Sequence, residues 1–157
     1  MRMAVLALTL LVAVPSMARA DATAFLGRNS AGDDRSGTRG FAAGVSMLVI
    51  GFEFEYANST EDLTTATPSL RTTSGNISAQ TFGLPGFQLY ATTGAGIYRE
   101  RLGSDEETAM ALNSGGGVKV KIAGPLRVRI DYRIFTLMGN PRHKNVQRLY
   151  AGLNLSF

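Results

Sequence analysis

The last eleven residues, Gln147–Phe157, alternate between apolar and polar or small side chains up to the final position. Successive side chains of a strand point to opposite faces, so this segment predicts a strand with one continuous apolar face. Eleven residues is about the length that a tilted strand needs to cross a bilayer, whereas strands of soluble proteins mostly have about five or six. Because chain ends usually fray into water, an apolar Phe157 predicts that the terminus itself is structural. The apolar face holds Leu149, Ala151, Leu153, Leu155 and Phe157, and the opposite face Arg148, Tyr150, Gly152, Asn154 and Ser156.

The first twenty residues have the composition of a secretory signal peptide. Arg2 gives a basic start, residues 4–14 form an apolar core, Pro15 breaks it, and Ala18-Arg19-Ala20 fits the small-x-small cleavage rule. A membrane anchor would need about twenty apolar residues, and no later run reaches that length. We therefore predict that residues 1–20 are removed and that residues 21–157 form one exported domain. This domain lacks cysteine, so it is not a disulfide scaffold.

Seven further segments alternate like the C-terminal one, and no stretch of helical periodicity competes with them. The predicted strands are residues 22–27, 40–47, 49–57, 75–81, 87–99, 109–122, 126–135 and 147–157. Long polar connections are expected at 28–39, 58–73, 100–108 and 138–145, and short turns at 48, 84–86 and 123–125. The pattern leaves open which way the side chains of the first strand face.

Eight antiparallel strands with an apolar face predict a closed barrel, because an open sheet would leave its edges unpaired. A soluble, lipocalin-type barrel has its apolar face inside, whereas an outer-membrane barrel presents it to lipid. Three features favour the membrane barrel: long and short connections alternate, the chain ends on an apolar aromatic residue, and the inner face is rich in glycine. That inner face holds too few bulky apolar groups to fill a soluble core. We thus predict an all-β, eight-stranded, antiparallel up-and-down transmembrane barrel with short periplasmic turns and longer extracellular loops.

Nine ionisable side chains share the face opposite to the apolar one. Near the bilayer midplane each Arg or Lys would cost about 2–4 kcal/mol, and several together would rival the whole stability of a domain, about 5–15 kcal/mol. They are therefore expected inside, where we favour a charge network that fills the lumen. Eight strands also leave just enough room for one small ligand, so a narrow anion path or a small-ligand cavity stays open as an alternative. The nine residues are Glu53, Glu55, Lys119, Lys121, Arg127, Arg129, Asp131, Arg133 and Arg148.

Counting residues up from the short turns predicts specific partners inside the barrel. Glu53 is expected near the level of Arg129, and Glu55 between Arg129 and Arg133, although shear makes the levels approximate. Buried charges of opposite sign at such distances should pair, because removal of one partner leaves the other unpaired.

The chain resembles the OmpA-type (OmpA/OmpX-like) eight-stranded outer-membrane β-barrel domains over all of residues 21–157. The ending Tyr150-x-Gly152-x-x-Leu155-x-Phe157 resembles the C-terminal signal that such proteins present to the barrel-insertion machinery. Residues 90–98 and 131–133 resemble the fifth and seventh strands of these domains. The resemblance implies location in the outer membrane of a Gram-negative-type bacterium after secretion to the periplasm. It also implies contact with outer-membrane lipid and lipopolysaccharide, and with the insertion machinery during biogenesis.

A structural or surface-interaction role through four outer loops is the predicted function, and the sequence names no ligand of those loops. A narrow solute or anion channel, or a small-ligand binder, is the alternative, and a lipid-modifying enzyme is a weaker one. The single histidine, His143, has no serine within two residues and no evident group to orient it, so we predict no catalytic residue.

Three other classes of site were considered. The acidic clusters 33–34 and 105–107 lack the ligand spacing of a calcium loop, so we expect no metal and no cofactor. The positive charges are scattered and form no basic block, which argues against nucleic acid. Arg99 and Arg101 are expected to point outward where a strand leaves the apolar band, and guanidinium groups there can donate to lipid phosphates. They predict a lipopolysaccharide contact.

Overall fold

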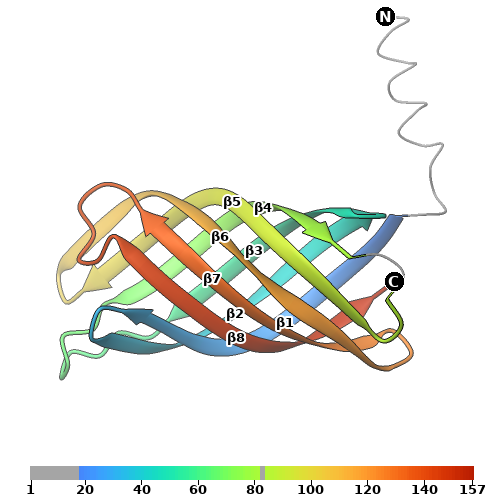
Figure 1. Ribbon diagram of the computed structural model, residues 1–157. Coiled ribbons are helices and arrows are strands. Elements are labelled where there is room, and N and C mark those ends of the chain that lie inside the picture. The colour runs from blue at the N-terminus through green and yellow to red at the C-terminus, as the bar shows by residue number, and fades with distance from the viewer. Residues whose placement is uncertain (1–17, 82–83) are drawn as a thin grey trace, which may run out of the picture.

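Eight strands form the whole of the fold in the computed structural model, which describes residues 18–81 and 84–157 (Figure 1). The strands are β1 (Ala18–Ala31), β2 (Asp34–Met47), β3 (Ile50–Ser59), β4 (Ser69–Gln80), β5 (Phe87–Leu102), β6 (Asp105–Ala123), β7 (Leu126–Leu137) and β8 (Asn145–Ser156). Most of the predicted signal peptide lies outside the described residues. Ala18–Ala20 extend β1, where Ala18 pairs with Met47, and cleavage after Ala20 stays a prediction.

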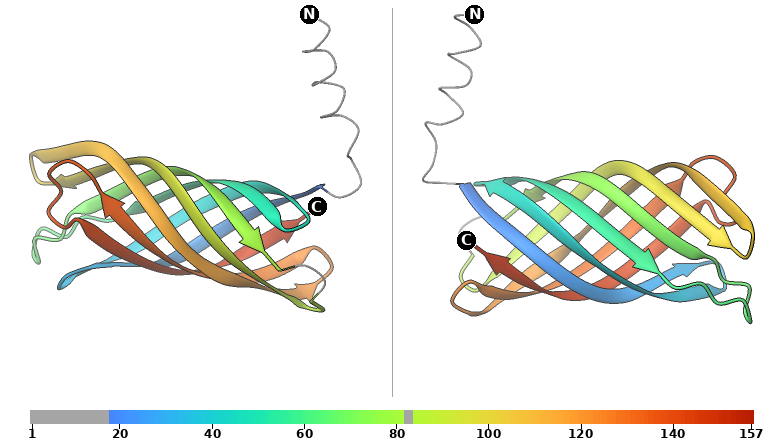
Figure 2. Two further views of the ribbon diagram at one scale, coloured as in Figure 1. Left: turned by 45° about the horizontal axis from the view of Figure 1, so that its top comes forward. Right: turned by 180° about the vertical axis from the view of Figure 1, so that it is seen from behind.

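Each strand pairs antiparallel with the next, and β1 pairs with β8, so the sheet closes into a barrel without free edges. The closure follows a continuous register: Leu155 of β8 lies opposite Leu126 of β7 on one side and Ala22 of β1 on the other. Figures 1 and 2 show the start of β1 and the C-terminus at the same end of the barrel. The predicted fold class is confirmed in its strand number, strand order and closure.

The barrel is apolar outside and polar inside, the reverse of a soluble protein. Large apolar side chains point outward along every strand; Phe52, Ile97 and Leu153 are each more than half exposed. The residues with the least exposed surface include three arginines and two acids: Arg129, Arg133, Arg148, Glu55 and Asp131. This distribution matches a membrane barrel and not a lipocalin-type one. Within the described residues, no helix is long and apolar enough to cross a bilayer.

The structure also resolves the orientation of β1, which the sequence pattern left open. Thr23, Phe25 and Asn29 are buried in the interior, whereas Leu26 is 70% exposed on the outer face. The inward face of β1 is thus mostly polar, but Phe25 fills space against Tyr150 of the neighbouring strand, with ring centroids 3.9 Å apart.

The predicted connection lengths are partly wrong. Two of the four connections expected to be long are two-residue turns at 32–33 and 103–104, while the other two span residues 60–68 and 138–144. Long and short connections therefore do not alternate strictly, and that argument for a membrane barrel fails. The argument from the inner face holds for the middle of the barrel, where charged and small side chains fill the lumen.

The error has a physical cause. Beyond the apolar band the strands continue as polar hairpins, in which both faces carry polar residues, so the sequence lost its alternation there. Asn29 and Thr38 nevertheless point into the barrel and are almost fully buried. Each hairpin turns at a glycine with positive φ, Gly32 at 59° and Gly103 at 62°, a conformation that glycine adopts without a steric penalty.

Candidate functional site

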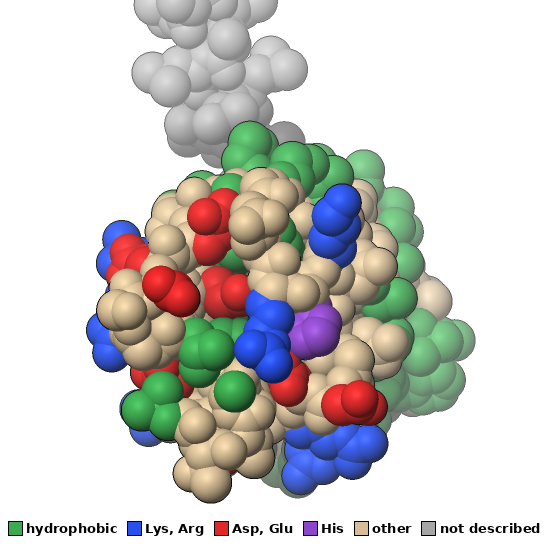
Figure 3. Space-filling model, turned by 90° about the vertical axis from the view of Figure 1, so that its left-hand side faces the viewer, with side chains coloured by type: hydrophobic (Ala, Val, Ile, Leu, Met, Phe, Trp, Pro, Cys, Tyr) green, Lys and Arg blue, Asp and Glu red, His purple; other side chains and the backbone are tan. Residues whose placement is uncertain are grey.

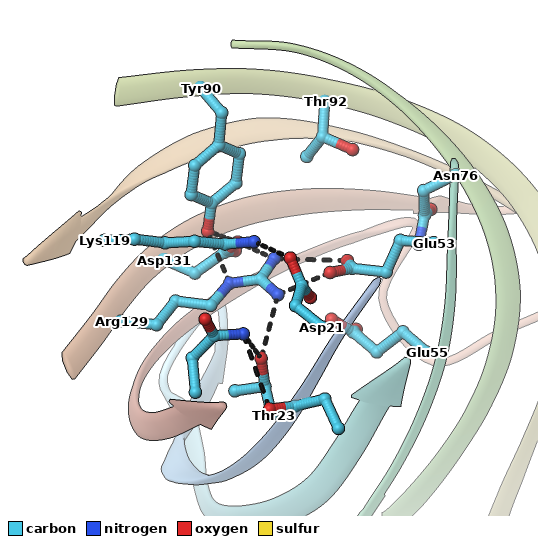
Figure 4. A network of polar contacts seen from close by, with 12 residues as sticks. Asp21, Thr23, Glu53, Glu55, Asn76, Tyr90, Thr92, Lys119, Arg129 and Asp131 are labelled. Atoms are coloured by element: carbon cyan, nitrogen blue, oxygen red, sulfur yellow. Dashed lines mark hydrogen bonds and ion pairs between the residues drawn. The ribbon is translucent and has the colours of Figure 1, made fainter. Parts of the chain in front are cut away.

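The lumen between the strands holds a network of buried charges (Figure 4). Arg129 of β7 donates to Glu53 on the far wall, its Nη2 lying 3.1 Å from Oε1, and the same nitrogen lies 3.0 Å from Asp131 Oδ2. Arg133 Nη2 donates to the same Glu53 oxygen at 2.7 Å, and Arg133 Nε donates to Asp131 Oδ1 at 2.9 Å. The predicted pair of Glu53 and Arg129 is present in the structure, and Arg133 joins it.

A second carboxylate, Glu55, lies in the same network and has no exposed surface. Its Oε1 accepts a hydrogen bond from Arg148 Nη1 at 3.0 Å, and its Oε2 accepts one from the Tyr150 hydroxyl at 3.2 Å. Arg133 Nη1 lies 3.1 Å from Oε2, an ion pair that lacks hydrogen-bond alignment. Arg148 also donates to Asn29 and to Thr72. Glu55 therefore lies between Arg133 and Arg148, whereas the sequence predicted a position between Arg129 and Arg133.

Neutral polar side chains complete the network. The Tyr90 hydroxyl donates to Asp131 and accepts from Arg129 Nε at 2.7 Å. Small residues make the room for these contacts: a Cβ on Gly117 would lie 2.5 Å from the Tyr90 hydroxyl oxygen, closer than side-chain atoms approach. Further buried hydrogen bonds link amides and hydroxyls around the wall, at Thr23, Ser74, Asn76, Asn113 and Asn154.

Lys119 forms an ion pair with Asp21 nearer the end that carries the termini. With this pair the buried charges balance, since Lys119, Arg129, Arg133 and Arg148 face Asp21, Glu53, Glu55 and Asp131. Two of the nine predicted lumen residues lie apart from the network at this mouth. Lys121 is exposed, and Arg127 is half-buried and donates to Gln88 at 3.2 Å. The positive charges of the nine predicted residues that lie outside the balanced network, Lys121 and Arg127, are thus both at this mouth.

Towards the opposite end the lumen becomes apolar. An interior cluster of buried side chains lies above the charges: Leu70, Tyr98, Ala111, Phe135, Leu137 and Val146. Phe135 joins the two layers, because the guanidinium carbon of Arg148 lies 4.4 Å from its ring centroid. Tyr98, Ala111 and Phe135 lie within predicted strands, whereas Leu70, Leu137 and Val146 lie outside them, and the clustering of the six was not predicted.

The connection 138–144 crosses the mouth above this apolar cluster. On the side of β5 and β6, Tyr98 donates to the Met138 carbonyl at 2.6 Å, and the backbone N–H groups of Asn140 and Arg142 donate to Glu107 and Glu100. On the side of β2, Asp34 pairs with Arg142 at 3.1 Å. Figure 3 looks onto this end, where acidic and basic side chains lie next to one another and apolar ones follow the barrel sides.

His143 belongs to this connection, and one expectation about it was wrong. The sequence indicated no group that would orient it, but Asp34 Oδ2 lies 3.0 Å from its Nε2. The two residues are 109 positions apart, so only the barrel closure brings them together. No hydroxyl group of the described residues hydrogen-bonds to His143, and the pair serves to hold the connection against β2.

Three other carboxylates at this end, those of Asp62, Glu106 and Glu61, also make local contacts. Asp62 accepts the backbone N–H of Thr64 at 2.9 Å, and this hydrogen bond lowers the pKa of its carboxyl. Glu106 pairs with Arg99 at 3.4 Å, and Glu61 with Arg101 at 3.9 Å. Arg99 and Arg101 do point outward at the end of β5, but each already has a carboxylate beside it.

The four residues of the predicted insertion signal divide between the two faces of β8. Leu155 and Phe157 are exposed on the outer surface, Phe157 to 73%, whereas Tyr150 and Gly152 face the lumen. Tyr150 is fully occupied there by Glu55 and by Phe25. Tyr150 therefore belongs both to the predicted insertion signal and to the charge network.

Solved structures of known barrels are similar to this chain. Neisserial surface protein A superposes with a TM-score of 0.71 at 15% identity, covering 89% of this chain and 97% of that one. The N-terminal β-barrel domain of Pseudomonas aeruginosa OprF gives 0.69 at 16% identity, with 88% and 97% covered. The outer membrane enzyme PagL gives 0.53 at 13% identity, with 86% and 98% covered.

The chain has the fold of an eight-stranded outer-membrane β-barrel. The expected resemblance to such barrels is confirmed at the level of the fold. No protein-family model matches the sequence, and no curated protein matches it. Because all three identities are below 20%, the fold is what these likenesses establish.

Proposed function

We propose that this protein is a small integral protein of the outer membrane, with a closed lumen and a structural or surface-interaction role through the connections at one end. The observation that carries this proposal is the filled interior. A balanced network of eight buried charges is followed along the barrel by an apolar cluster, and the connection 138–144 lies across the mouth. A pore needs a continuous polar path, and the apolar cluster interrupts it.

The narrow anion channel remains the second candidate, and one feature favours it. A cavity of about 360 Å³ opens at the end that carries the termini, lined among others by Lys119, Lys121 and Arg127. Its positive charge would attract anions. Arg129 and its carboxylate partners lie further along the lumen, so in our proposal the cavity is a closed vestibule.

The orientation and biogenesis of the barrel form part of the proposal. The turns 48–49 and 124–125 would face the periplasm, and the four connections at the other end the medium. Leu155 and Phe157 would present the C-terminal signal to the insertion machinery and then lie against lipid. We propose no catalytic role, because His143 and Asp34 lack a nucleophile beside them among the described residues.

Single cysteines test the orientation cleanly, because the chain has no cysteine of its own. An impermeant thiol reagent on intact cells is expected to label Leu63→Cys in the 60–68 connection and Ser104→Cys in the 103–104 turn. Pro125→Cys, at the opposite end, should react only after the outer membrane is permeabilised. Labelling of Pro125→Cys on intact cells, with Leu63→Cys and Ser104→Cys protected, would reverse the orientation.

A further inference from the structure

Three arginines lie together on the outward face of the β1–β2 hairpin: Arg28, Arg35 and Arg39, here called the hairpin arginines. All three are exposed. The register places Arg28 opposite Gly37, so Arg35 and Arg39, two positions to either side of Gly37, are its diagonal neighbours. Diagonal neighbours of antiparallel strands lie about 7–8 Å apart, within reach of long side chains. Three positive charges therefore share one patch of the barrel wall.

Among the described residues no carboxylate pairs with this patch, and Asp33, which is exposed in the turn two residues before Arg35, lies beyond ion-pair distance of the three arginines. None of the hairpin arginines has an ion-pair partner among the residues that the structure describes. The outward residues of the flanking strands carry no acid either: Phe52, Phe54, Tyr56 and Asn58 on β3, and Gln147, Leu149, Ala151, Leu153 and Leu155 on β8. Arg99 and Arg101 differ in this respect, because each has a glutamate beside it. Like charges on neighbouring strands repel one another, and an anion bound between them would offset this repulsion.

An apolar groove of about 870 Å³ begins at Arg39 and runs down the outer wall. Its floor is made by small residues, Ala24 and Ala151, which are diagonal neighbours because Leu26 lies opposite Ala151. Phe41 and Tyr56 form one wall, with ring centroids 5.6 Å apart, and Leu153 lies on the other side. The side chain of Arg39, one of the hairpin arginines, thus lies at one end of the apolar groove.

We propose that this surface binds one molecule of a phosphate-bearing glycolipid of the outer leaflet, of the lipopolysaccharide class. An acyl chain lies in the groove, and the phosphate groups accept charge-assisted hydrogen bonds from the hairpin arginines. A second copy of the chain fits this face poorly, because a two-fold interface would bring the same uncompensated arginines towards each other. The inference rests on the proposed outer-membrane location and moves the main lipid contact from Arg99 and Arg101 to the hairpin arginines.

The experiment measures binding of purified lipopolysaccharide to the refolded full-length barrel in phosphatidylcholine vesicles. For the variant Arg28→Gln/Arg39→Gln we expect binding about a hundredfold weaker, roughly tenfold for each arginine whose charge-assisted hydrogen bonds are lost. The matched variant Arg99→Gln/Arg101→Gln should bind within about threefold of the parent, because those arginines are already paired. Heat-modifiable migration on gels shows that each variant has folded.

Two further arms separate the parts of the site. Ala24→Leu keeps every charge but fills the groove, and it should weaken lipopolysaccharide binding as well. Dephosphorylated lipopolysaccharide should bind the parent about as weakly as intact lipopolysaccharide binds the Arg28→Gln/Arg39→Gln variant. Equal losses in the two arginine variants, unchanged binding by Ala24→Leu, or cross-linking of the parent into dimers through β1–β2 would overturn the assignment. These outcomes concern lipid binding only. A folded barrel that did not bind lipopolysaccharide as expected would leave the closed-lumen proposal unaffected, because that proposal is tested by conductance.

Discussion

Replacing Glu55 by glutamine is expected to lower the free energy of unfolding by about 3–5 kcal/mol, the cost of stranding a buried charge. The Glu55 side chain has no exposed surface and lies between Arg133 and Arg148. Glutamine keeps the shape but removes the negative charge, so two guanidinium groups would share the remaining acids of the network. Urea unfolding of the refolded barrel in lipid vesicles measures the change.

Glu106→Gln is the matched control, because Glu106 also pairs with an arginine but on the exposed surface. Its effect should be about 0–1 kcal/mol, as for other surface pairs. The double variant Glu55→Gln/Arg148→Met should be less destabilised than the sum of its single changes, since both members of the pair are then neutral. Equal effects of Glu55→Gln and Glu106→Gln would show that the network contributes no more than surface charges do.

Phe135→Ala is expected to cost about 3–5 kcal/mol, the usual range for removing a fully buried aromatic ring. Phe135 is 1% exposed; it belongs to the apolar cluster and contacts the guanidinium of Arg148. The change would open space in the layer that separates the charge network from the loop end. The same urea unfolding assay measures it.

Phe135→Leu serves as the control because it retains most of the apolar volume, and its cost should be clearly smaller. If Phe135→Ala and Phe135→Leu were both as stable as the parent, the apolar cluster would not be a packed layer. The interior near the loop end would then have to be open to water.

The course of the strands through the apolar band could be read from the sequence because one face there is apolar. β7 is the clearest case: Val128, Ile130 and Ile134 alternate with Arg129 and Arg133, and a shift by one residue would turn the arginines to lipid. The ends of the hairpins could not be read in this way. Near Asn29 and Ser36, which pair across β1 and β2, both faces of the hairpin are polar, so apolar and polar residues no longer alternate.

The pairing inside the lumen could be predicted only in part. Parity placed Glu53 and Arg129 on the inner face, and counting from the turns brought them to one level. The contact of Glu55 with Arg148 depends on the shear of the closed sheet, which the sequence pattern does not contain. Asp21 was missed because it precedes the predicted strand 22–27, whereas β1 begins at Ala18, and it balances Lys119.

The contacts at the loop end depend on closure in the same way. Asp34 and His143 lie on hairpins that are far apart in the sequence, and no spacing rule links them. The inward apolar residues Leu70, Leu137 and Val146 sit at strand ends, outside the predicted strands, so their shared layer emerged only from the structure.

Planar-bilayer recording of the refolded full-length protein tests the closed lumen most directly. Insertion is verified first, by protease protection of the barrel in the same lipid. With its charges paired and its apolar cluster in place, the parent protein should show no steady single-channel conductance at either polarity. Stable openings of one defined size, in salts of small ions and with folded protein, would contradict the closed lumen and favour the anion channel.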